Sequence, residues 1–343
     1  MLPKSPARRP SHPGSARKPH YFLGIDMGGT KSHALVCDDS GQALGFAEGG
    51  PGNPEGVGYP QMTAVLQQIT AEALQAAGLG PGDICGAGFG LAGYDWPSER
   101  AANLEVIATL GLNCPVDAVN DTVIGLIAGA SEGWGVAIEA GTGENCWGWD
   151  PQHRTGRVTG SGTFLGEFGG AWSVVFRAVQ AVSLAWSRRG PATALTDAFV
   201  QLAGKPDVTS LIEAISLEQV YFGSEHAPLV FEIARQGDPV AIDVLRWAAE
   251  ELAGLACGVI RQLAFEDQVF EIVMMGSLFS GGPLLVEPMQ AKILALAPQA
   301  RFVRLNAPPV AGGVLLGMQC TGLDGNPRRA RLLESARALV EKH

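Results

Sequence analysis

Near the start of the chain, a short glycine turn has an acidic residue directly ahead of it. Asp26 ends an apolar segment, residues 28–31 (Gly-Gly-Thr-Lys) form the turn, and residues 32–36 lead out as a second apolar segment. Glycine reaches positive φ without steric cost, so this pattern predicts a tight hairpin whose backbone N–H groups can bind phosphate oxygens. The Asp26 carboxylate stands where it could hold a magnesium ion through water.

Two commoner phosphate-binding patterns do not fit this turn. In a P-loop, lysine directly follows the second glycine of the pattern, whereas Thr30 separates Gly29 from Lys31 here. A dinucleotide fingerprint needs G-x-G-x-x-G at the start of a helix, but these glycines are spaced differently and residues 32–36 favour a strand. A structural hairpin with a coincidental aspartate is the alternative for this segment taken alone.

A second segment repeats the arrangement about one domain length further along the chain. Residues 134–140 favour a strand, residues 141–143 (Gly-Thr-Gly) a turn, and residues 144–149 a returning strand. Between the two hairpins, Asn120 and Asp121 follow a short strand and open a helix. This position suits an N-cap, and it also suits a catalytic group at the carboxyl end of a strand. Two such halves facing one another across a cleft could hold a triphosphate from both sides.

The segments around these motifs alternate between strand and helix patterns. Apolar runs at 84–91, 116–119 and 270–275 favour strands, whereas residues 59–77 and 239–263 carry apolar side chains at helical spacing. Together with a length of 343 residues, the alternation predicts an α/β chain of two domains. Glycines after the 270–275 strand would let a flat ligand approach the backbone.

Composition narrows the classes of partner. The net charge of −10 argues against a general binder of nucleic acid or of membrane surfaces. The first twenty residues are basic and proline-rich without an apolar stretch, which predicts a disordered tail, with a transit peptide as the weaker alternative. The six cysteines form no C-x-x-C pair and lie mostly in apolar runs, which favours reduced thiols in a cytoplasmic protein.

Five motifs, at residues 26–31, 120–121, 140–143, 275–277 and 311–317, fall in one order. They are similar to the two phosphate, two connecting and one adenosine motifs of the actin-like ATPase (sugar kinase/Hsp70/actin) superfamily. Within it, residues 21–322 resemble the BadF/BadG/BcrA/BcrD family, and most closely its N-acetylglucosamine kinase branch. The resemblance implies an α/β, two-lobed, duplicated ribonuclease H-like fold with an interdomain cleft. Its parts would be a tail at 1–20, domains at 21–127 and 128–322, and a C-terminal helix at 323–343.

The resemblance also implies roles for single residues. Asp121 would accept the proton of the sugar hydroxyl, and Asp26 would organise Mg²⁺ and contact the nucleotide. The sugar would be held by Asp121 together with Asn53, Thr142, Asn145 and Glu167. ATP would be bound by the first turn (Gly28, Gly29, Thr30, Lys31), by the second turn (Gly141, Thr142, Gly143) and, around adenosine, by Gly276, Ser277, Gly281 and Gly282.

Two positions depart from the pattern of these kinases. They carry Gly-Asp-Glu-Gly-Ser where residues 166–170 here read Gly-Glu-Phe-Gly-Gly, so Glu167 replaces an aspartate and moves the carboxylate oxygens by more than about 1 Å. Glu139 precedes the second turn, where an uncharged residue is usual. Both positions border the expected sugar pocket, so they bear on which sugar is bound and leave the nucleotide chemistry as it is.

The expected reaction is ATP-dependent phosphorylation of an amino sugar, N-acetylglucosamine at its 6-hydroxyl, by a cytoplasmic homodimer that uses Mg²⁺. Glucosamine, N-acetylmuramate or another hexose is the alternative acceptor. One rival from another class is an ATPase that drives electron transfer, but the dehydratase activators of this family bridge an iron–sulfur cluster with paired cysteines. Another is a sugar-sensing regulator, and such regulators commonly carry a helix-turn-helix domain for which the N-terminal tail is too short.

Overall fold

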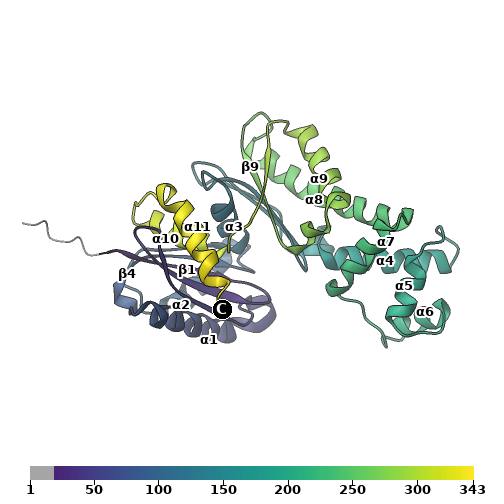
Figure 1. Cartoon of the computed structure of the whole chain (residues 1–343), viewed down its shortest axis with the longest axis horizontal. Helices are drawn as coiled ribbons and strands as arrows, with labels where there is room; N and C mark the ends of the chain where they lie inside the picture. The colour runs from purple at the N-terminus through teal and green to yellow at the C-terminus, as the bar shows by residue number, and fades with distance from the viewer. Residues whose placement is uncertain (1–18) are drawn as a thin grey trace, which may run out of the picture.

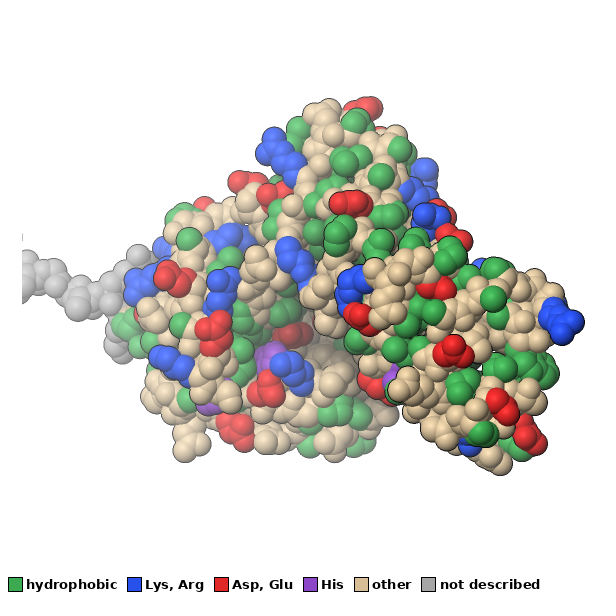
Figure 2. All heavy atoms as spheres, turned by 45° about the vertical axis from the view of Figure 1, so that its right-hand side comes forward, with side chains coloured by type: hydrophobic (Ala, Val, Ile, Leu, Met, Phe, Trp, Pro, Cys, Tyr) green, Lys and Arg blue, Asp and Glu red, His purple; other side chains and the backbone are tan. Residues whose placement is uncertain are grey.

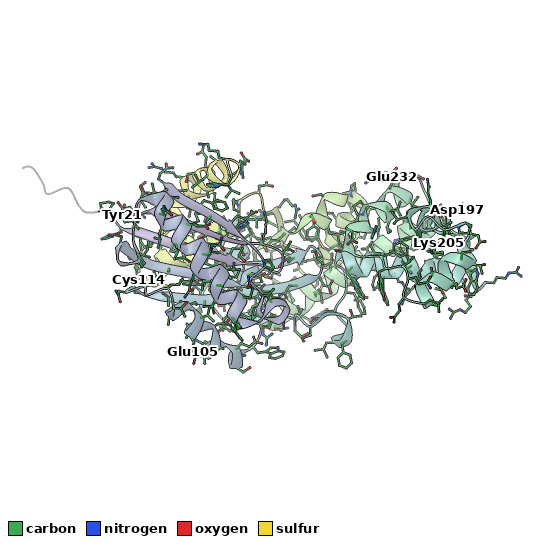
Figure 3. All side chains as sticks on the ribbon, turned by 90° about the horizontal axis from the view of Figure 1, so that it is seen from below. Tyr21, Glu105, Cys114, Asp197, Lys205 and Glu232 are labelled. Carbon is green, nitrogen blue, oxygen red and sulfur yellow. The ribbon has the colours of Figure 1, made fainter. Side chains whose placement is uncertain are left out.

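The computed structural model describes residues 19–343, which form two α/β lobes (Figure 1). Up to residue 18, the predicted tail lies outside the described residues. Each lobe contains a five-stranded mixed sheet. Seen from below, Tyr21, Glu105 and Cys114 mark the first lobe, and Asp197, Lys205 and Glu232 mark the far end of the second (Figure 3).

The two sheets share one topology. In the first, the strands β1 (Tyr21–Met27), β2 (Ser32–Asp38), β3 (Ala43–Gly49), β4 (Ile84–Leu91) and β5 (Val116–Asn120) are ordered β3-β2-β1-β4-β5. In the second, β6 (Gly135–Ala140), β7 (Glu144–Trp149), β8 (Thr155–Arg157), β9 (Glu271–Met275) and β10 (Arg301–Arg304) are ordered β10-β9-β6-β7-β8. In both sheets the first strand is central, pairs antiparallel with the second and parallel with the fourth. The fold is therefore a duplicated α/β unit.

Helices cover both faces of the first sheet. Leu23, Ile25 and Met27 alternate along β1 and are buried against α1 (Pro54–Ala77) on one face. On the other face lie α10 (Val310–Cys320) and α11 (Asn326–Val340), the last two helices of the chain (Figure 1). A Cβ at Gly24 or Gly88 would overlap the α10 backbone, so glycine at these positions lets the helix lie directly on the sheet. The division into domains at 21–127 and 128–322 stays a prediction.

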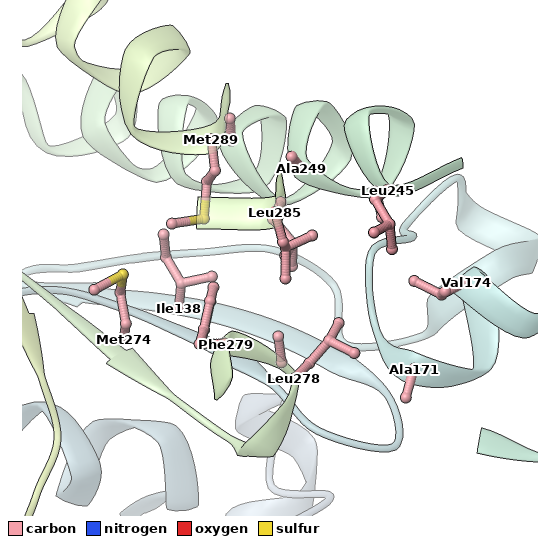
Figure 4. Packing of buried hydrophobic residues seen from close by; sticks show 14 of the residues in the cluster. Ile138, Ala171, Val174, Leu245, Ala249, Met274, Leu278, Phe279, Leu285 and Met289 are labelled. Atoms are coloured by element: carbon pink, nitrogen blue, oxygen red, sulfur yellow. The ribbon is translucent and has the colours of Figure 1, made fainter. Parts of the chain in front are cut away.

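The second lobe has its own hydrophobic core. The long helix α8 (Pro239–Leu263) packs on β6, β7 and α9 (Pro283–Leu296). Figure 4 shows Ile138 and Met274 of the sheet meeting Leu285 and Met289 of α9. The remaining helices are α2 (Arg100–Ala108), α3 (Asp121–Gly129), α4 (Ala171–Trp186), α5 (Leu195–Leu202), α6 (Val208–Ser216) and α7 (Ala227–Arg235), with 3₁₀ turns η1 (Pro81–Asp83), η2 (Pro97–Glu99), η3 (Gly162–Leu165), η4 (Ser224–His226) and η5 (Ser277–Gly281).

Two further features bear on the classes considered above. Among the residues that the structure describes, no helix is long and apolar enough to cross a bilayer. All six cysteines are free, and burial raises the pKa of the Cys37 and Cys146 thiols. A thiol held in its protonated form is a poor nucleophile and a poor metal ligand.

Candidate active site

The first glycine turn joins β1 to β2 and presents its backbone to solvent. The Gly28 N–H donates to the Lys31 carbonyl at 3.1 Å and closes the turn. Gly29 and Thr30 are exposed, and a Cβ on Gly29 would meet no atom within 4 Å. Lys31 lies 3.2 Å from Glu48, so its ammonium group already has an acidic partner. The turn therefore offers exposed backbone N–H donors, as a phosphate-binding turn requires.

Beside this turn, a buried histidine lies between two carboxylates. The hairpin register places His33 opposite Asp26, with 3.8 Å between His33 Nδ1 and Asp26 Oδ2 and 2.9 Å between His33 Nε2 and Glu48. Burial acts to lower the pKa of His33, but the carboxylates of Asp26 and Glu48 outweigh it, so the net pKa is raised. Sequence reasoning missed His33, although its place opposite Asp26 follows from hairpin pairing alone.

Asp121 lies where the two lobes meet. Asn120 caps α3 by accepting a hydrogen bond from the Thr122 N–H at 2.9 Å, which fixes Asp121 as the first residue of the helix. From the second lobe, Glu139 of β6 accepts a hydrogen bond from the Thr122 hydroxyl at 3.2 Å. Burial raises the pKa of Asp121 well above its ordinary value, and the charges of Glu139 and Asp26 add to the effect. Three acids from the ends of β1, β5 and β6 thus act on one another.

These acids do not form a ready-made metal site. Within residues 19–343, no group of three or more His, Cys, Asp or Glu side chains is arranged to hold a metal ion. Magnesium commonly takes one or two protein carboxylates and completes its shell with water and substrate phosphates. The donor set at Asp26 fits that mode of binding, because the carboxylate stands directly ahead of the exposed turn.

The second glycine turn is held by hydrogen bonds from the start of α4. The Gly141 N–H donates to the Gly143 carbonyl at 2.9 Å, so this turn is one residue shorter than the first, where Gly28 donates to Lys31. The first N–H groups of α4 donate in turn to the Gly141 and Thr142 carbonyls at 2.9 and 3.0 Å. Asn145 accepts a hydrogen bond from the next backbone N–H at 2.8 Å. The second turn is thus held by backbone bonds, whereas charged side chains surround the first.

A cavity of about 460 Å³ opens beside the second turn. Its wall contains Gly141 and Thr142, together with Ser277 and Gly281 of η5. Gly276 and Gly282, both with φ near 90°, border η5 and do not line the cavity. The other wall comes from η4 and α7 and includes Glu225, Phe231 and Arg235, which the sequence motifs did not indicate. The size suits a nucleoside, and the lining joins the predicted phosphate and adenosine residues.

The residues expected at the sugar are held by local bonds. Asn53 caps α1, its side-chain oxygen accepting from the Glu55 N–H at 2.9 Å. Glu167 is buried, and its two oxygens accept from the N–H groups of Thr159 at 2.6 Å and Gly162 at 3.3 Å. Its carboxylate therefore folds the glycine-rich segment 159–167, and a contact of Glu167 with the sugar stays a prediction. Figure 2 shows the molecule hollowed between the two lobes, with acidic side chains in the recess.

Two lobes of one topology, each bringing a glycine turn toward a shared set of acids, define the two-lobed fold of the actin-like ATPases. The chain belongs to the BadF/BadG/BcrA/BcrD ATPase family, whose model matches residues 23–294.

Named relatives and a solved structure agree with this family. The N-acetylmuramic acid/N-acetylglucosamine kinase of Clostridium acetobutylicum is 23% identical over 299 residues, which cover 86% of this chain and 97% of that protein. The N-acetyl-D-glucosamine kinase of Dictyostelium discoideum is 26% identical over 315 residues, covering 87% and 97%. The structure of an assigned N-acetylglucosamine kinase from Chromobacterium violaceum, 22% identical, superposes with a TM-score of 0.66 over 87% of this chain and 98% of that one.

Proposed function

We propose that this chain is an ATP-dependent kinase that phosphorylates a hydroxyl of an amino sugar, with N-acetylglucosamine and its 6-hydroxyl as the first candidates. The names of the full-length relatives support the reaction class. The observation that carries the proposal is the position of Asp121. It stands at the start of α3, within electrostatic range of Asp26 from the first lobe and Glu139 from the second.

The nucleotide would be held by both lobes. The turn of Gly28, Gly29 and Thr30, in which Gly29 and Thr30 are exposed, would bind phosphate oxygens from one side, and the turn of Gly141, Thr142 and Gly143 from the other. The cavity between the second turn, η5 and α7 would take the nucleoside. Mg²⁺ bound with ATP would neutralise phosphate charge, and Asp26 would hold it through water.

The protein's own part in the reaction is to position groups and to stabilise charge. Asp121 would orient the attacking hydroxyl and accept its proton. Burial and the neighbouring acids raise the pKa of Asp121, which makes its carboxylate a stronger base than that of an ordinary aspartate. The interlobe recess would exclude water and so favour transfer to the sugar over hydrolysis of ATP.

One observation favours glucosamine as a second candidate acceptor. Asp95, Glu139 and Glu167 all lie on the predicted sugar side, and the nearby positive charge that acts on Asp95 is that of Arg157. A surplus of carboxylates favours a cationic ligand, and the amine of glucosamine carries a positive charge at neutral pH.

A coupled assay of ADP release tests the proposal. We expect ADP release to depend on an added sugar when glucosamine, N-acetylglucosamine, N-acetylmannosamine, N-acetylmuramate and glucose are compared. ADP release that no sugar changes would instead indicate an ATPase of another kind. A homodimer remains part of the proposal, and the mass of the protein in solution tests it.

A further inference from the structure

Asp95 is a buried acid that none of the five motifs contains. It lies between β4 and η2, and its side chain is only 9% exposed. Glu99 fixes the local backbone, because its carboxylate accepts hydrogen bonds from the N–H groups of Asp95 and Trp96 at 2.9 and 2.8 Å. The position of Asp95 is therefore set by the chain around it and needs no ligand to form.

Asp95 lies near two of the residues expected at the sugar, through their neighbours in the chain. The Asn120 amide donates to Asp95 Oδ1 at 3.2 Å, which places the acid beside the residue that precedes Asp121. Gly93, two residues earlier, packs so closely on Asn53 that a side chain there would overlap the asparagine. On the first lobe, Asp95 is thus linked to the surroundings of Asn53 and Asp121.

The second lobe reaches the same acid. A Cβ on Gly160 would lie 2.9 Å from Asp95 Oδ1, so the glycine-rich segment folded by Glu167 contacts Asp95 directly. Next to it, the Arg157 guanidinium lies 4.2 Å from the centre of the Trp96 ring. Asp95 thus occupies the seam between the lobes and does not line the nucleoside cavity.

The free protein satisfies this carboxylate poorly. Asp95 Oδ1 has the Asn120 amide, whereas Oδ2 has no hydrogen-bond donor among the described residues. Glu55 of α1, Glu99 of η2 and Glu167 of the second lobe repel its charge, and Arg157 of β8 attracts it. Burial, reinforced by these acids, raises the pKa of Asp95 to about 6. The second carboxylate oxygen of Asp95 is therefore free to accept hydrogen bonds from a ligand, and a largely buried acid with a raised pKa in a cleft is common at functional sites.

We propose that Asp95 is a sugar-binding residue, whose free carboxylate oxygen accepts hydrogen bonds from hydroxyl or amine groups of the substrate. Sugars carry several O–H donors on one face, and a carboxylate accepts such bonds more strongly than a neutral group does. The inference rests on the proposed kinase function and adds a specificity-determining residue to it.

The Asp95→Asn variant tests this role, because asparagine keeps an oxygen for the Asn120 amide and removes the charge. We expect KM for the preferred sugar to rise roughly tenfold or more, and KM for ATP to stay within about twofold. We also expect the variant to melt no lower than the wild type, since a buried charge is removed. Asp117→Asn is the matched control: Asp117 lies on β5, is 39% exposed, faces Arg100 at 3.8 Å, and should leave both KM values unchanged.

The outcomes separate the two hypotheses. If the wild type uses a sugar and Asp95→Asn keeps its sugar KM, the sugar-binding role of Asp95 is wrong and the kinase proposal stands. If the variant melts lower and loses sugar and ATP use in parallel, Asp95 is a structural support of Asn120, which also overturns the inference. If the wild type releases no sugar-dependent ADP, the kinase proposal fails, and the role of Asp95 fails with it.

Discussion

Each glycine turn is closed by a hydrogen bond from the N–H of its first glycine, but the two turns have different surroundings. Around the first turn, Asp26, Lys31, His33 and Glu48 form a chain of charged contacts. The second turn is fixed by backbone bonds from α4 and borders a cavity with a largely uncharged lining. The duplicated fold has therefore been used in two ways. Under the proposed function, one copy would supply charge for the phosphates and the reacting hydroxyl, and the other would supply a shaped pocket.

The largest effect should come from Asp121, where the two copies meet. We expect Asp121→Asn to lower kcat by roughly 10²-fold or more, because the amide cannot accept the hydroxyl proton. ATP binding should be unchanged, since the nucleotide contacts that we propose come from the turns and the cavity. The coupled assay and an ATP titration measure the two quantities. Near-normal kcat would exclude Asp121 as the base.

The shape of the second lobe is tested at Gly281. A Cβ there would overlap the Phe231 ring, and the neighbours that must move line the cavity. We expect Gly281→Ala to raise KM for ATP about tenfold and to lower the free energy of unfolding by about 1–3 kcal/mol. Gly254→Ala on the exposed side of α8 is the control, because its Cβ meets nothing within 4 Å. An unchanged KM for ATP in Gly281→Ala would show that the nucleotide does not bind in this cavity.

The stability of the protein should depend on pH through Asp95, a buried acid of the first lobe. Its pKa is raised to about 6 in the folded protein, above the value of an unfolded aspartate, so the ionised form destabilises the fold. This cost is full above about pH 6 and disappears as the pH falls toward about 4. Asp95→Asn should therefore melt a few degrees above the wild type near pH 8, and this advantage should shrink at lower pH. Melting curves across this range measure it, and a constant difference would contradict the prediction.

The smallest effect should come from Lys31. Its pair with Glu48 is exposed, with side chains 58% and 51% accessible. Such pairs contribute under about 1 kcal/mol, so Lys31→Ala should leave chemical denaturation nearly unchanged. If the first turn binds phosphate through its backbone, KM for ATP should rise only about threefold. A loss comparable to that of Gly281→Ala would show that the lysine side chain carries the phosphate contact.

Local patterns predicted the parts of this structure that depend on local interactions. The two hairpins, the short β5 strand and the helix start at Asp121 follow from glycine turns, alternation and capping, all of which act over a few residues. The helix expected at 59–77 follows a kink at Gly58 (φ 76°), and a short helical segment that begins at Pro54 precedes this kink within α1. The regular spacing of apolar residues begins after this kink, so the sequence predicts only the later part of α1.

Contacts between distant segments could not be predicted in the same way. Phe231 and Arg235 lie on a helix whose apolar pattern says nothing about η5, about fifty residues further along. Asp95 follows a turn like many others, and its burial depends on Gly160 of the other lobe. The packing of α10 on Gly24 and Gly88 joins opposite ends of the chain. These features needed the assembled fold, since their cause is a neighbour that sequence spacing does not reveal.

The return of α10 to the first sheet means that the polypeptide passes between the lobes twice, once after α3 and once after β10. A body attached to another at two points can rotate about the line that joins them, but it cannot swivel freely. Opening and closing of the recess between the lobes is thereby confined to rotation about one hinge axis. Helix α10, which lies near the C-terminus and is remote in sequence from Asp121, thus restricts the direction in which the two lobes can move.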